Sequence, residues 1–564
     1  MPSPVGVAVT IPEGVKRISS AFSSNIDIRR VDIHGGVSVI SDSAFEGVTY
    51  LTELNIAKGV SHIGVRAFSY CRALISLTLP DSVKTVGEYA FEGCEGLRTV
   101  SLPPSIGSIS RAMFSECISL ESIVIPEGIT EIGANAFYKA RALRNITLPE
   151  TLVKIGKNAF IMTAFETFTI PDSVTEVGEC ILSEAPKLEA LVLGKGLSEI
   201  PVGICLGAPK LSKIILPEGY ASVGDDAFAD CISLISLELP SSITNIGSAA
   251  FFGCRALESL RADGIVSVGE GAFRSCDKLS VFKLPKTVRS IGASAFRDCV
   301  LIDGFDLSGV RTIGEYAFYG CSSLTSADLS SVEHYIPDNL FSACESLTEI
   351  KLSDSIVKIG NGAFHSTLIK EISLPDALRY IESSAFINCV YLERVDFDSS
   401  LVYIGVSAFS YCERLTEAIF PDSLETISEK AFESCPSLTT VRMGDNVRTI
   451  GPSAFYYCSR LSELRLSSSL SEIPDLAFSN CYQLSWLIIP RGIRAIGQSA
   501  FYSCVNLVRV DMASDLREIR TNAFSGCKAL KYVDYRGTRA EFETVTFYSG
   551  NDELRSASLT EVAE

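Results

Sequence analysis

The chain has 564 residues, of which 49 are basic and 67 are acidic, so its formal net charge is −18. A surface of that sign repels nucleic acids and anionic membranes, and we therefore expect no nucleic-acid partner. The apolar runs are only as long as strands, so the sequence predicts no transmembrane helix and no insertion into a membrane.

Phenylalanine recurs at a fixed interval along almost the whole chain. Phe45, Phe68 and Phe91 are 23 residues apart, and with Leu182 and Cys205 standing in for Phe the chain holds 23 repeats, four of which follow a step of 22. A fixed period in the twenties is typical of a leucine-rich-repeat solenoid. We predict a right-handed superhelix of about 23 coils. A parallel β-sheet is expected on one face, with short strands, turns and 3-10 segments on the others.

The predicted ends of the array follow from its repeats. The sequence predicts one continuous leucine-rich-repeat array over residues 1–564. The first repeat, residues 1–22, is interpreted as an N-terminal cap, and residues 536–564 as a C-terminal cap and tail. Each cap is needed because a coil can cover its apolar face only against a neighbouring coil.

One repeat shows what each coil contains. Leu77-x-Leu79 alternates apolar and variable residues, which indicates a strand, and Pro80 ends that strand because it has no N–H to donate. A second short apolar pair follows, and then Gly87, which permits a tight bend. Ala90 to Leu97 has apolar residues at spacings of three and four and is read as a helical or 3-10 turn.

The cysteines occupy one slot of the repeat, three residues after the Phe. Sixteen of the 18 cysteines stand there, and Ala, Val, Thr or Asn fills the slot in the other seven repeats. Those residues cannot form a disulfide or bind a soft metal, so the slot requires a small buried side chain. We predict free, buried thiols, which do not indicate a redox compartment.

Two stretches depart from the regular pattern. Over 160–215 two Phe positions are replaced, which indicates either drift of the repeat or a local hinge. Over 255–335 several strand-ending prolines are missing and two steps are short. Ala190, Val192 and Ile215 form a mildly apolar patch among the predicted outward positions. The sequence does not decide between drift and a hinge.

The predicted outward strand residues become charged and aromatic from about residue 349. They can pair laterally and stabilise the sheet, or they can form a partner site. Arg442 and Arg465 place like charges on adjacent strands, and the only tryptophan lies beside them; Trp and Arg are enriched at binding hot spots. The candidate partner-binding residues are Arg442, Glu463, Arg465, Trp486, Ile488, Arg509 and Tyr532.

Residues that could support catalysis are few. The four histidines lie in different phases of the repeat, so stacking does not bring them together. A metal site or histidine-based catalysis is therefore not expected. No glycine-rich segment continues into a phosphate-binding loop. We expect no enzymatic activity, no catalytic residue, no cofactor and no metal.

The consensus sequence of the repeat resembles that of the BspA-like class of leucine-rich repeat. The resemblance is carried by Leu-x-x-Leu-x-Leu-Pro-x-Ser-Val-x-x-Ile-Gly-x-x-Ala-Phe-x-x-Cys, as in Leu74 to Cys94 and Leu234 to Cys254, and it covers about residues 5–540. Tyr535 to Phe542 also resembles the closing segment of such arrays. The resemblance implies a surface or secreted protein of a host-associated anaerobic bacterium or protozoan parasite. It also implies a role in adhesion.

Two functions follow from these observations. The first is a non-catalytic protein-binding or adhesion solenoid that presents its exposed sheet to a protein or cell-surface partner, such as a host protein. The second is an intracellular structural or assembly scaffold, which is favoured because Met1 to Gly6 contains no basic and apolar leader segment. The resemblance points to the cell surface, and the missing leader points to the cytoplasm. The sequence leaves the partner and the oligomeric state open.

Overall fold

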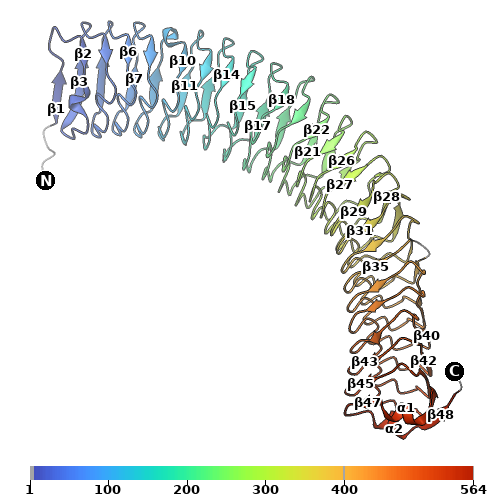
Figure 1. Ribbon diagram of the computed structural model, residues 1–564. Coiled ribbons are helices and arrows are strands. Elements are labelled where there is room, and N and C mark those ends of the chain that lie inside the picture. The colour runs from blue at the N-terminus through green and yellow to red at the C-terminus, as the bar shows by residue number, and fades with distance from the viewer. Residues whose placement is uncertain (1–5, 398–399, 563–564) are drawn as a thin grey trace. The chain divides into compact units, whose positions relative to one another are not determined.

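The computed structural model of the chain describes residues 6–397 and 400–562. It is a parallel β-solenoid of about 24 coils with few helices, so the predicted fold class is confirmed (Figure 1). The extra coil, beyond the 23 predicted, contains the strand β47 (Thr546–Phe547). The chain divides into two compact units, Met1–Pro285 and Lys286–Glu564, which are described separately.

This boundary lies within the second irregular stretch, residues 255–335. The hinge in residues 160–215, the single array and the two terminal caps remain predictions.

Each coil of the first unit contributes one strand to a first row. These strands are β1 (Val7–Thr10), β3 (Ile28–Ile33), β5 (Glu53–Ile56), β7 (Ser76–Thr78), β9 (Thr99–Ser101), β11 (Ser122–Val124), β13 (Asn145–Thr147), β15 (Thr167–Thr169), β17 (Ala190–Val192), β19 (Lys213–Ile215), β21 (Ser236–Glu238), β23 (Ser259–Arg261) and β25 (Val281–Phe282). Neighbours pair in parallel, one repeat apart, as β7 does with β9.

A second row of two-residue strands follows the first along each coil of this unit. Its members are β2 (Arg17–Ile18), β4 (Val39–Ile40), β6 (His62–Ile63), β8 (Thr85–Val86), β10 (Ser108–Ile109), β12 (Glu131–Ile132), β14 (Lys154–Ile155), β16 (Glu176–Val177), β18 (Glu199–Ile200), β20 (Ser222–Val223), β22 (Asn245–Ile246) and β24 (Ser267–Val268). Two 3-10 segments lie between strands, η1 (Ser20–Phe22) and η2 (Pro104–Ile106).

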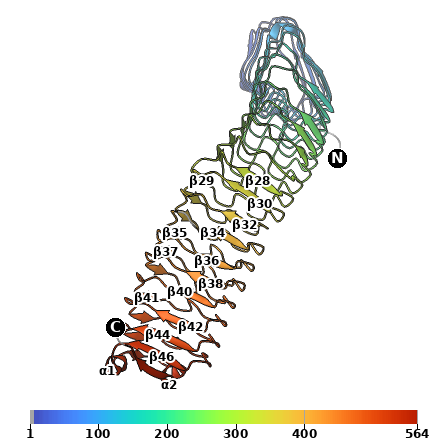
Figure 2. The ribbon, with the colours of Figure 1, turned by 90° about the vertical axis from the view of Figure 1, so that its right-hand side faces the viewer.

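The second unit has the same two rows, which Figure 2 shows as separate columns of strands. The first row contains β28 (Ser326–Leu329), β30 (Glu349–Leu352), β32 (Glu371–Ser373), β34 (Arg394–Asp396), β36 (Glu417–Ile419), β38 (Thr440–Arg442), β40 (Glu463–Arg465), β42 (Trp486–Ile489), β44 (Arg509–Ala513), β46 (Tyr532–Arg536) and β48 (Ser558–Glu561).

The second row of this unit again consists of two-residue strands. They are β26 (Ser290–Ile291), β27 (Thr312–Ile313), β29 (Tyr335–Ile336), β31 (Lys358–Ile359), β33 (Tyr380–Ile381), β35 (Tyr403–Ile404), β37 (Thr426–Ile427), β39 (Thr449–Ile450), β41 (Glu472–Ile473), β43 (Ala495–Ile496), β45 (Glu518–Ile519) and β47. Two short helices, α1 (Arg539–Glu543) and α2 (Asp552–Ser556), follow β46, and Leu554 of α2 is buried.

The alternation of the repeat sets which strand residues are buried. In β7 the middle residue Leu77 is buried, whereas Ser76 and Thr78 are exposed. Leu79 turns into the core and Pro80 follows it outside the strand, as predicted. The exposed residues of successive strands therefore lie next to one another and form two lateral columns on the sheet.

The segment around each Phe contains the expected turns of 3-10 type but is not a continuous helix. Glu92 and Cys94, for example, donate their amides to the carbonyls of Tyr89 and Phe91, at 3.1 and 3.4 Å. Around Phe91 the two flanking residues Tyr89 and Gly93 have φ of 59° and 66°, which is left-handed backbone that no helix contains. The amides of Tyr89, Phe91 and Gly93 donate to carbonyls of the next coil, at 2.8–3.1 Å. Alternate amides therefore pair between coils, and this pattern prevents the intrachain ladder of a helix.

The Phe rings form a stack inside each unit. In the first unit, ring centroids from Phe22 to Phe160 are separated by 5.1–5.9 Å and the rings are nearly parallel. Beyond Phe160 the next position is Leu182. There Phe165 and Phe168 pack against Phe160, with centroids at 5.8 and 5.1 Å. These two strand-side rings fill the volume that the missing Phe leaves.

The prediction of free, buried cysteines is confirmed. All 18 thiols are free, and every one except half-exposed Cys180 is buried. The thiol of Cys94 donates a hydrogen bond to the carbonyl of Phe68 in the preceding coil, with sulfur and oxygen 3.4 Å apart, and most of the other slot cysteines repeat this contact. Sequence reasoning missed this bond, which explains why a small weak donor suits the slot.

Glycine after the second strand allows the coils to approach closely. A Cβ atom on Gly451 would lie 2.1 Å from the backbone nitrogen of Glu429 in the preceding coil. We expect Gly451→Ala to lower the free energy of unfolding by about 2–4 kcal/mol, because two backbones would have to separate. Gly304→Ala is the control, since its Cβ would meet no atom within 4 Å. Urea unfolding curves compare the two variants; equal stabilities would contradict the close-packing argument.

Candidate functional site

The candidate site lies on the exposed side of the first strand row in the second unit. Strand side chains alternate between the two faces of a sheet, so the first and third residues of β38, β40 and β42 point away from the core. Figure 2 shows β36 to β46 following one another down this unit. All seven predicted residues lie on β38 to β46, and all seven are exposed. The middle residues of β38, β40 and β42 are buried or half-buried.

Trp486 lies at the centre of this face. It pairs in register with Arg509 on β44, which in turn pairs with Tyr532 on β46. Trp486 is 55% exposed, Ile488 42% and Tyr532 41%. The structure therefore places three large, mainly apolar side chains in solvent, two on β42 and one on β46. An indole held on a paired strand loses little conformational freedom when a partner covers it.

The arginines beside Trp486 are each paired with a carboxylate. Arg442 and Arg465 are direct neighbours in the ladder, as the sequence predicted. The predicted like-charge conflict is nevertheless relieved. Arg442 contacts Glu463 at 2.6 Å, and Arg465 reaches Asp445 at 3.0 Å. The hydrogen bond that Arg442 donates to the carboxylate of Glu463 raises the pKa of Arg442 above its ordinary value.

The arginines beyond Trp486 are paired in the same way. The guanidinium of Arg509 lies 5.2 Å from the ring centroid of Tyr532 and 3.4 Å from the carboxylate of Asp534. Arg536 contacts Asp511 at 2.8 Å. The site is thus an apolar centre within a rim of neutralised ion pairs. Such a surface can bury its Trp without leaving a buried charge unpaired.

A tyrosine cluster near the Phe turns was missed by the sequence reasoning. The rings of Tyr457 and Tyr482 meet edge to face with centroids 5.9 Å apart, and Tyr456 lies beside Tyr457 at 6.4 Å. Tyr457 and Tyr502 are exposed. These residues occupy variable slots one, two and four residues after the Phe. Comparing those slots between repeats, and not only the strand columns, would have found them.

The first unit has a groove of its own on the same row of strands. Its volume is about 790 Å³, and β19, β21, β23 and β25 line it. Arg261 lies in the groove between Glu238 and Asp263, at 2.8 Å from each. Val281 and Ile215 are its exposed apolar residues. The apolar patch noted at Ile215 is therefore one wall of this groove.

The described residues offer little that could carry catalysis. In residues 6–397 and 400–562 no group of three or more His, Cys, Asp or Glu side chains could hold a metal ion. The ring of His34 is hydrogen-bonded to the carbonyl of Pro12 at 2.8 Å, and burial lowers the pKa of His365. Within the same residues no helix is long and apolar enough to cross a bilayer.

Comparison with known proteins decides the family. The family model described as "BspA type Leucine rich repeat region (6 copies)" matches residues 7–78, 61–189, 198–325, 311–439 and 425–553. The chain belongs to this family. The resemblance that its repeat suggested is thus confirmed over nearly the whole sequence. The comparison with curated proteins finds no match.

Solved structures of leucine-rich-repeat proteins are similar to this BspA-type chain. A leucine-rich cell surface protein from Faecalibacterium prausnitzii is 29% identical, with 58% of this chain and 86% of that chain covered and a TM-score of 0.37. A leucine-rich-repeat protein from Bacteroides ovatus is 21% identical, with 89% and 88% covered and a TM-score of 0.25. The pneumococcal vaccine antigen PcpA is 17% identical, with 71% and 89% covered and a TM-score of 0.33.

Proposed function

We propose that this BspA-type protein is a non-catalytic adhesion or protein-binding solenoid, and that its partner is a protein at a cell surface. The observation that carries the proposal is the exposed Trp486, with Ile488 and Tyr532 beside it on paired strands. Membership of the BspA-type family supports protein binding or adhesion at the level of the family. The proposed binding residues are the seven residues of the candidate site on β38 to β46.

The physical support is the combination of rigid aromatic anchors with a neutral rim. Large aromatic residues at the centre of an interface contribute most of its binding free energy when they are fully desolvated. The ion pairs Arg442–Glu463 and Arg465–Asp445 hold the rim side chains in place. A rim that is already paired adds little repulsion, so binding here is expected to depend weakly on salt.

Replacing the tryptophan tests the proposal directly. We expect Trp486→Ala to weaken partner binding by at least about 30-fold, which corresponds to about 2 kcal/mol, because a central aromatic anchor is lost. The measurement is the affinity of the labelled full chain for intact cells, and then for the purified protein it captures. Tyr335→Ala is the matched control, since Tyr335 is an exposed aromatic residue of β29 in the other strand row.

The single tryptophan also serves as a reporter. Covering Trp486 with a partner should shift its fluorescence emission to shorter wavelength, because the exposed indole leaves water. Unchanged affinity of Trp486→Ala, or loss of binding in Tyr335→Ala instead, would place binding on another face and refute the proposed site.

A further inference from the structure

Four tyrosines lie on three successive coils of the second unit, on the side that the Phe segments form. Tyr456 and Tyr457 follow Phe455, Tyr482 belongs to the next coil, and Tyr502 belongs to the coil after that. Tyr457 is 42% exposed and Tyr502 41%, whereas the other two are half-buried. The rings of Tyr457 and Tyr482 meet edge to face, with centroids 5.9 Å apart. These four residues are called the tyrosine cluster, and none of them belongs to the candidate site on β38 to β46.

The backbone holds the tyrosine cluster in register. The amide of Tyr457 donates to the carbonyl of Ser479 at 2.9 Å, and the amide of Asn480 donates to the carbonyl of Tyr502 at 2.8 Å. Hydrogen-bonded coils are about 4.8 Å apart, so the equivalent residues Tyr456 and Tyr502 are separated by about 10 Å along the array. Ser479, the equivalent residue between them, is buried and places no ring there. The backbone therefore fixes the interval between these tyrosines.

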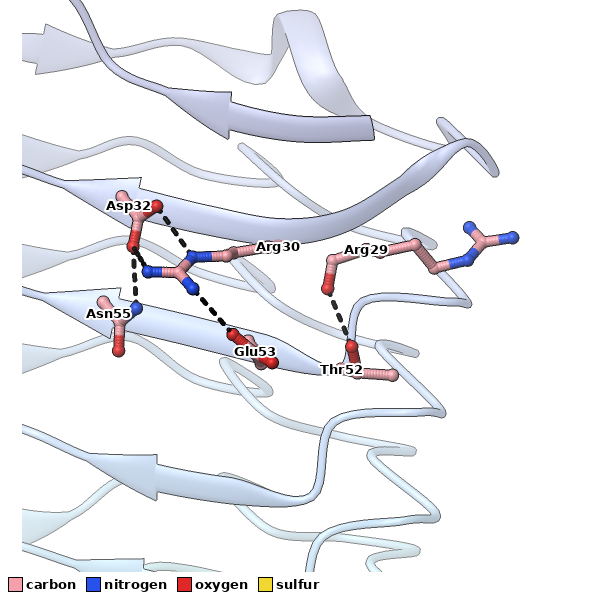
Figure 3. Close-up of polar contacts among 6 residues, drawn as sticks. All are labelled: Arg29, Arg30, Asp32, Thr52, Glu53 and Asn55. Atoms are coloured by element: carbon pink, nitrogen blue, oxygen red, sulfur yellow. Dashed lines mark hydrogen bonds and ion pairs between the residues drawn. The ribbon is translucent and has the colours of Figure 1, made fainter. Parts of the chain in front are cut away.

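Most tyrosines that follow a Phe in other coils lie against a cation, Tyr411 being the exception. A guanidinium or ammonium group lies 4.4–5.9 Å from the ring centroid of Tyr50, Tyr70, Tyr138, Tyr319 and Tyr391. Figure 3 shows one of these cations, Arg29, pointing away from the ion pairs of Arg30; its guanidinium lies 4.5 Å from the centroid of Tyr50. Among the described residues no cation lies over a ring of the tyrosine cluster. The ring faces that are exposed here are therefore available to a ligand.

The surface around the tyrosine cluster is polar but almost uncharged. Of the five residues that follow each Phe in these three coils, only Arg460 is charged. The side-chain amides of Gln483 and Asn506 are exposed, and within the described chain they form no hydrogen bond with another residue. The pKa of Tyr482 is raised by burial and by the neighbouring tyrosines, and no carboxylate contributes. Because an amide both donates and accepts hydrogen bonds, this surface suits a neutral ligand that carries hydroxyl groups.

We propose that the tyrosine cluster binds a neutral oligosaccharide that lies along the direction in which the coils stack. One face of a sugar ring carries C–H groups that pack on an aromatic ring, while its hydroxyl groups both donate and accept hydrogen bonds. The distance from one coil to the next, about 4.8 Å, is close to the length of one sugar in an extended chain. The three coils of the cluster therefore match three consecutive sugars.

Charge separates this ligand from other polymers that could lie on the rings. Single-stranded nucleic acid also stacks on aromatic side chains, but it needs a basic groove along its backbone. Sulfated and sialylated glycans are anions as well. The tyrosine cluster offers one arginine in a chain of formal charge −18, so neither kind of anion is favoured. The cluster is separate from Trp486, and glycan binding here does not rest on the function proposed for that site.

A glycan array that carries neutral, sialylated and sulfated oligosaccharides tests the proposal with the labelled full chain. The wild-type chain should retain neutral glycans, and calorimetric titration should show an affinity that rises with glycan length up to about three sugars. Tyr457→Ala and Tyr502→Ala should each weaken this binding at least about tenfold, because each removes an exposed ring on which a sugar packs. Tyr457→Phe should keep most of the affinity, since it keeps the ring.

Tyr380→Ala is the matched control, because Tyr380 is 39% exposed and lies on β33 in the other strand row. It should bind glycans as the wild type does, and so should Trp486→Ala, which keeps a failure here distinct from a failure of the site on β38 to β46. Circular dichroism should show all variants to be folded. Retention of no neutral glycan, or of charged glycans only, would overturn the proposal. Unchanged affinity in both alanine variants of the cluster, equal affinity for one sugar and for three, or loss of binding in either control would overturn it as well.

Discussion

Raising the pH from 8 to about 10 is expected to unfold the protein, because its buried thiols resist ionisation only while it is folded. Burial raises the pKa of Cys94 and Cys435 to about 12 and that of Cys389 to about 11. Below pH 9 these thiols hold their proton in both states, so their contribution to stability is complete. Above pH 9 the unfolded chain ionises first, and stability falls until the pH passes the folded pKa.

The expected effect is large because the thiols act together. At pH 10 each such thiol lowers the free energy of unfolding by about 1.4 kcal/mol, so these three alone remove about 4 kcal/mol. That is a large part of the stability of an ordinary domain. The other buried cysteines add to this loss wherever burial raises their pKa in the same direction, as it does for Cys117 and Cys412.

The measurement follows thiolate absorbance and far-ultraviolet circular dichroism in one alkaline titration. Both signals should change together between pH 9 and pH 11, since ionisation and unfolding are linked. Half-exposed Cys180 is an internal control, because it should react with a maleimide in the folded protein while the buried thiols do not. Thiolate absorbance that rises near pH 9 with an intact spectrum would show that the thiols are accessible.

Removing one ring from the phenylalanine stack is expected to cost about 3–5 kcal/mol of stability. Phe432 lies between Phe409 and Phe455, with ring centroids 5.1 and 5.2 Å away, and it also contacts Phe397 and Phe420. Phe432→Ala would leave a cavity that rigid coils on both sides cannot close. Because the stability of a stacked array depends on the contacts between neighbouring coils, the cavity should also destabilise the adjoining coils.

Urea unfolding followed by circular dichroism measures this loss. Tyr411→Ala removes an exposed ring in the same unit and should change stability by less than about 0.5 kcal/mol. Hydrogen exchange should show the additional opening confined to coils near Phe432. A Phe432→Ala protein as stable as Tyr411→Ala would mean that the stacked rings contribute no more than surface residues.

Much of the fold could be predicted from the sequence because equivalent residues of the repeat recur at a nearly constant spacing along the chain. Phe at steps of 22 or 23 residues specified which side chains stack, and Leu77 and Leu79 specified which side of a strand is buried. The cysteine slot revealed small buried side chains for the same reason. The left-handed residues beside Phe91 were not predicted, because Tyr, Ser, Asn and Gly all occupy those positions and share no side-chain signal.

The candidate site shows which contacts the spacing of the repeat does not predict. The sequence placed Arg442 beside Arg465 and Trp486 beside Arg509, since ladder neighbours are one repeat apart. It did not show that Arg442 turns to Glu463 while Arg465 turns to Asp445. Those contacts run diagonally between coils and depend on side-chain conformation, which the repeat does not encode. The tyrosines at 457 and 482 meet for the same reason.

The sequence by itself determined the solenoid class, the order of its coils and the buried column to which each repeated residue belongs, because a constant number of residues per coil fixes their lateral alignment. Only the tertiary structure decided which charges neutralise one another and how the amides around each Phe pair between coils. These features depend on how the groups of neighbouring coils are oriented toward one another in space. A repeat motif gives the residues of each coil but not those orientations.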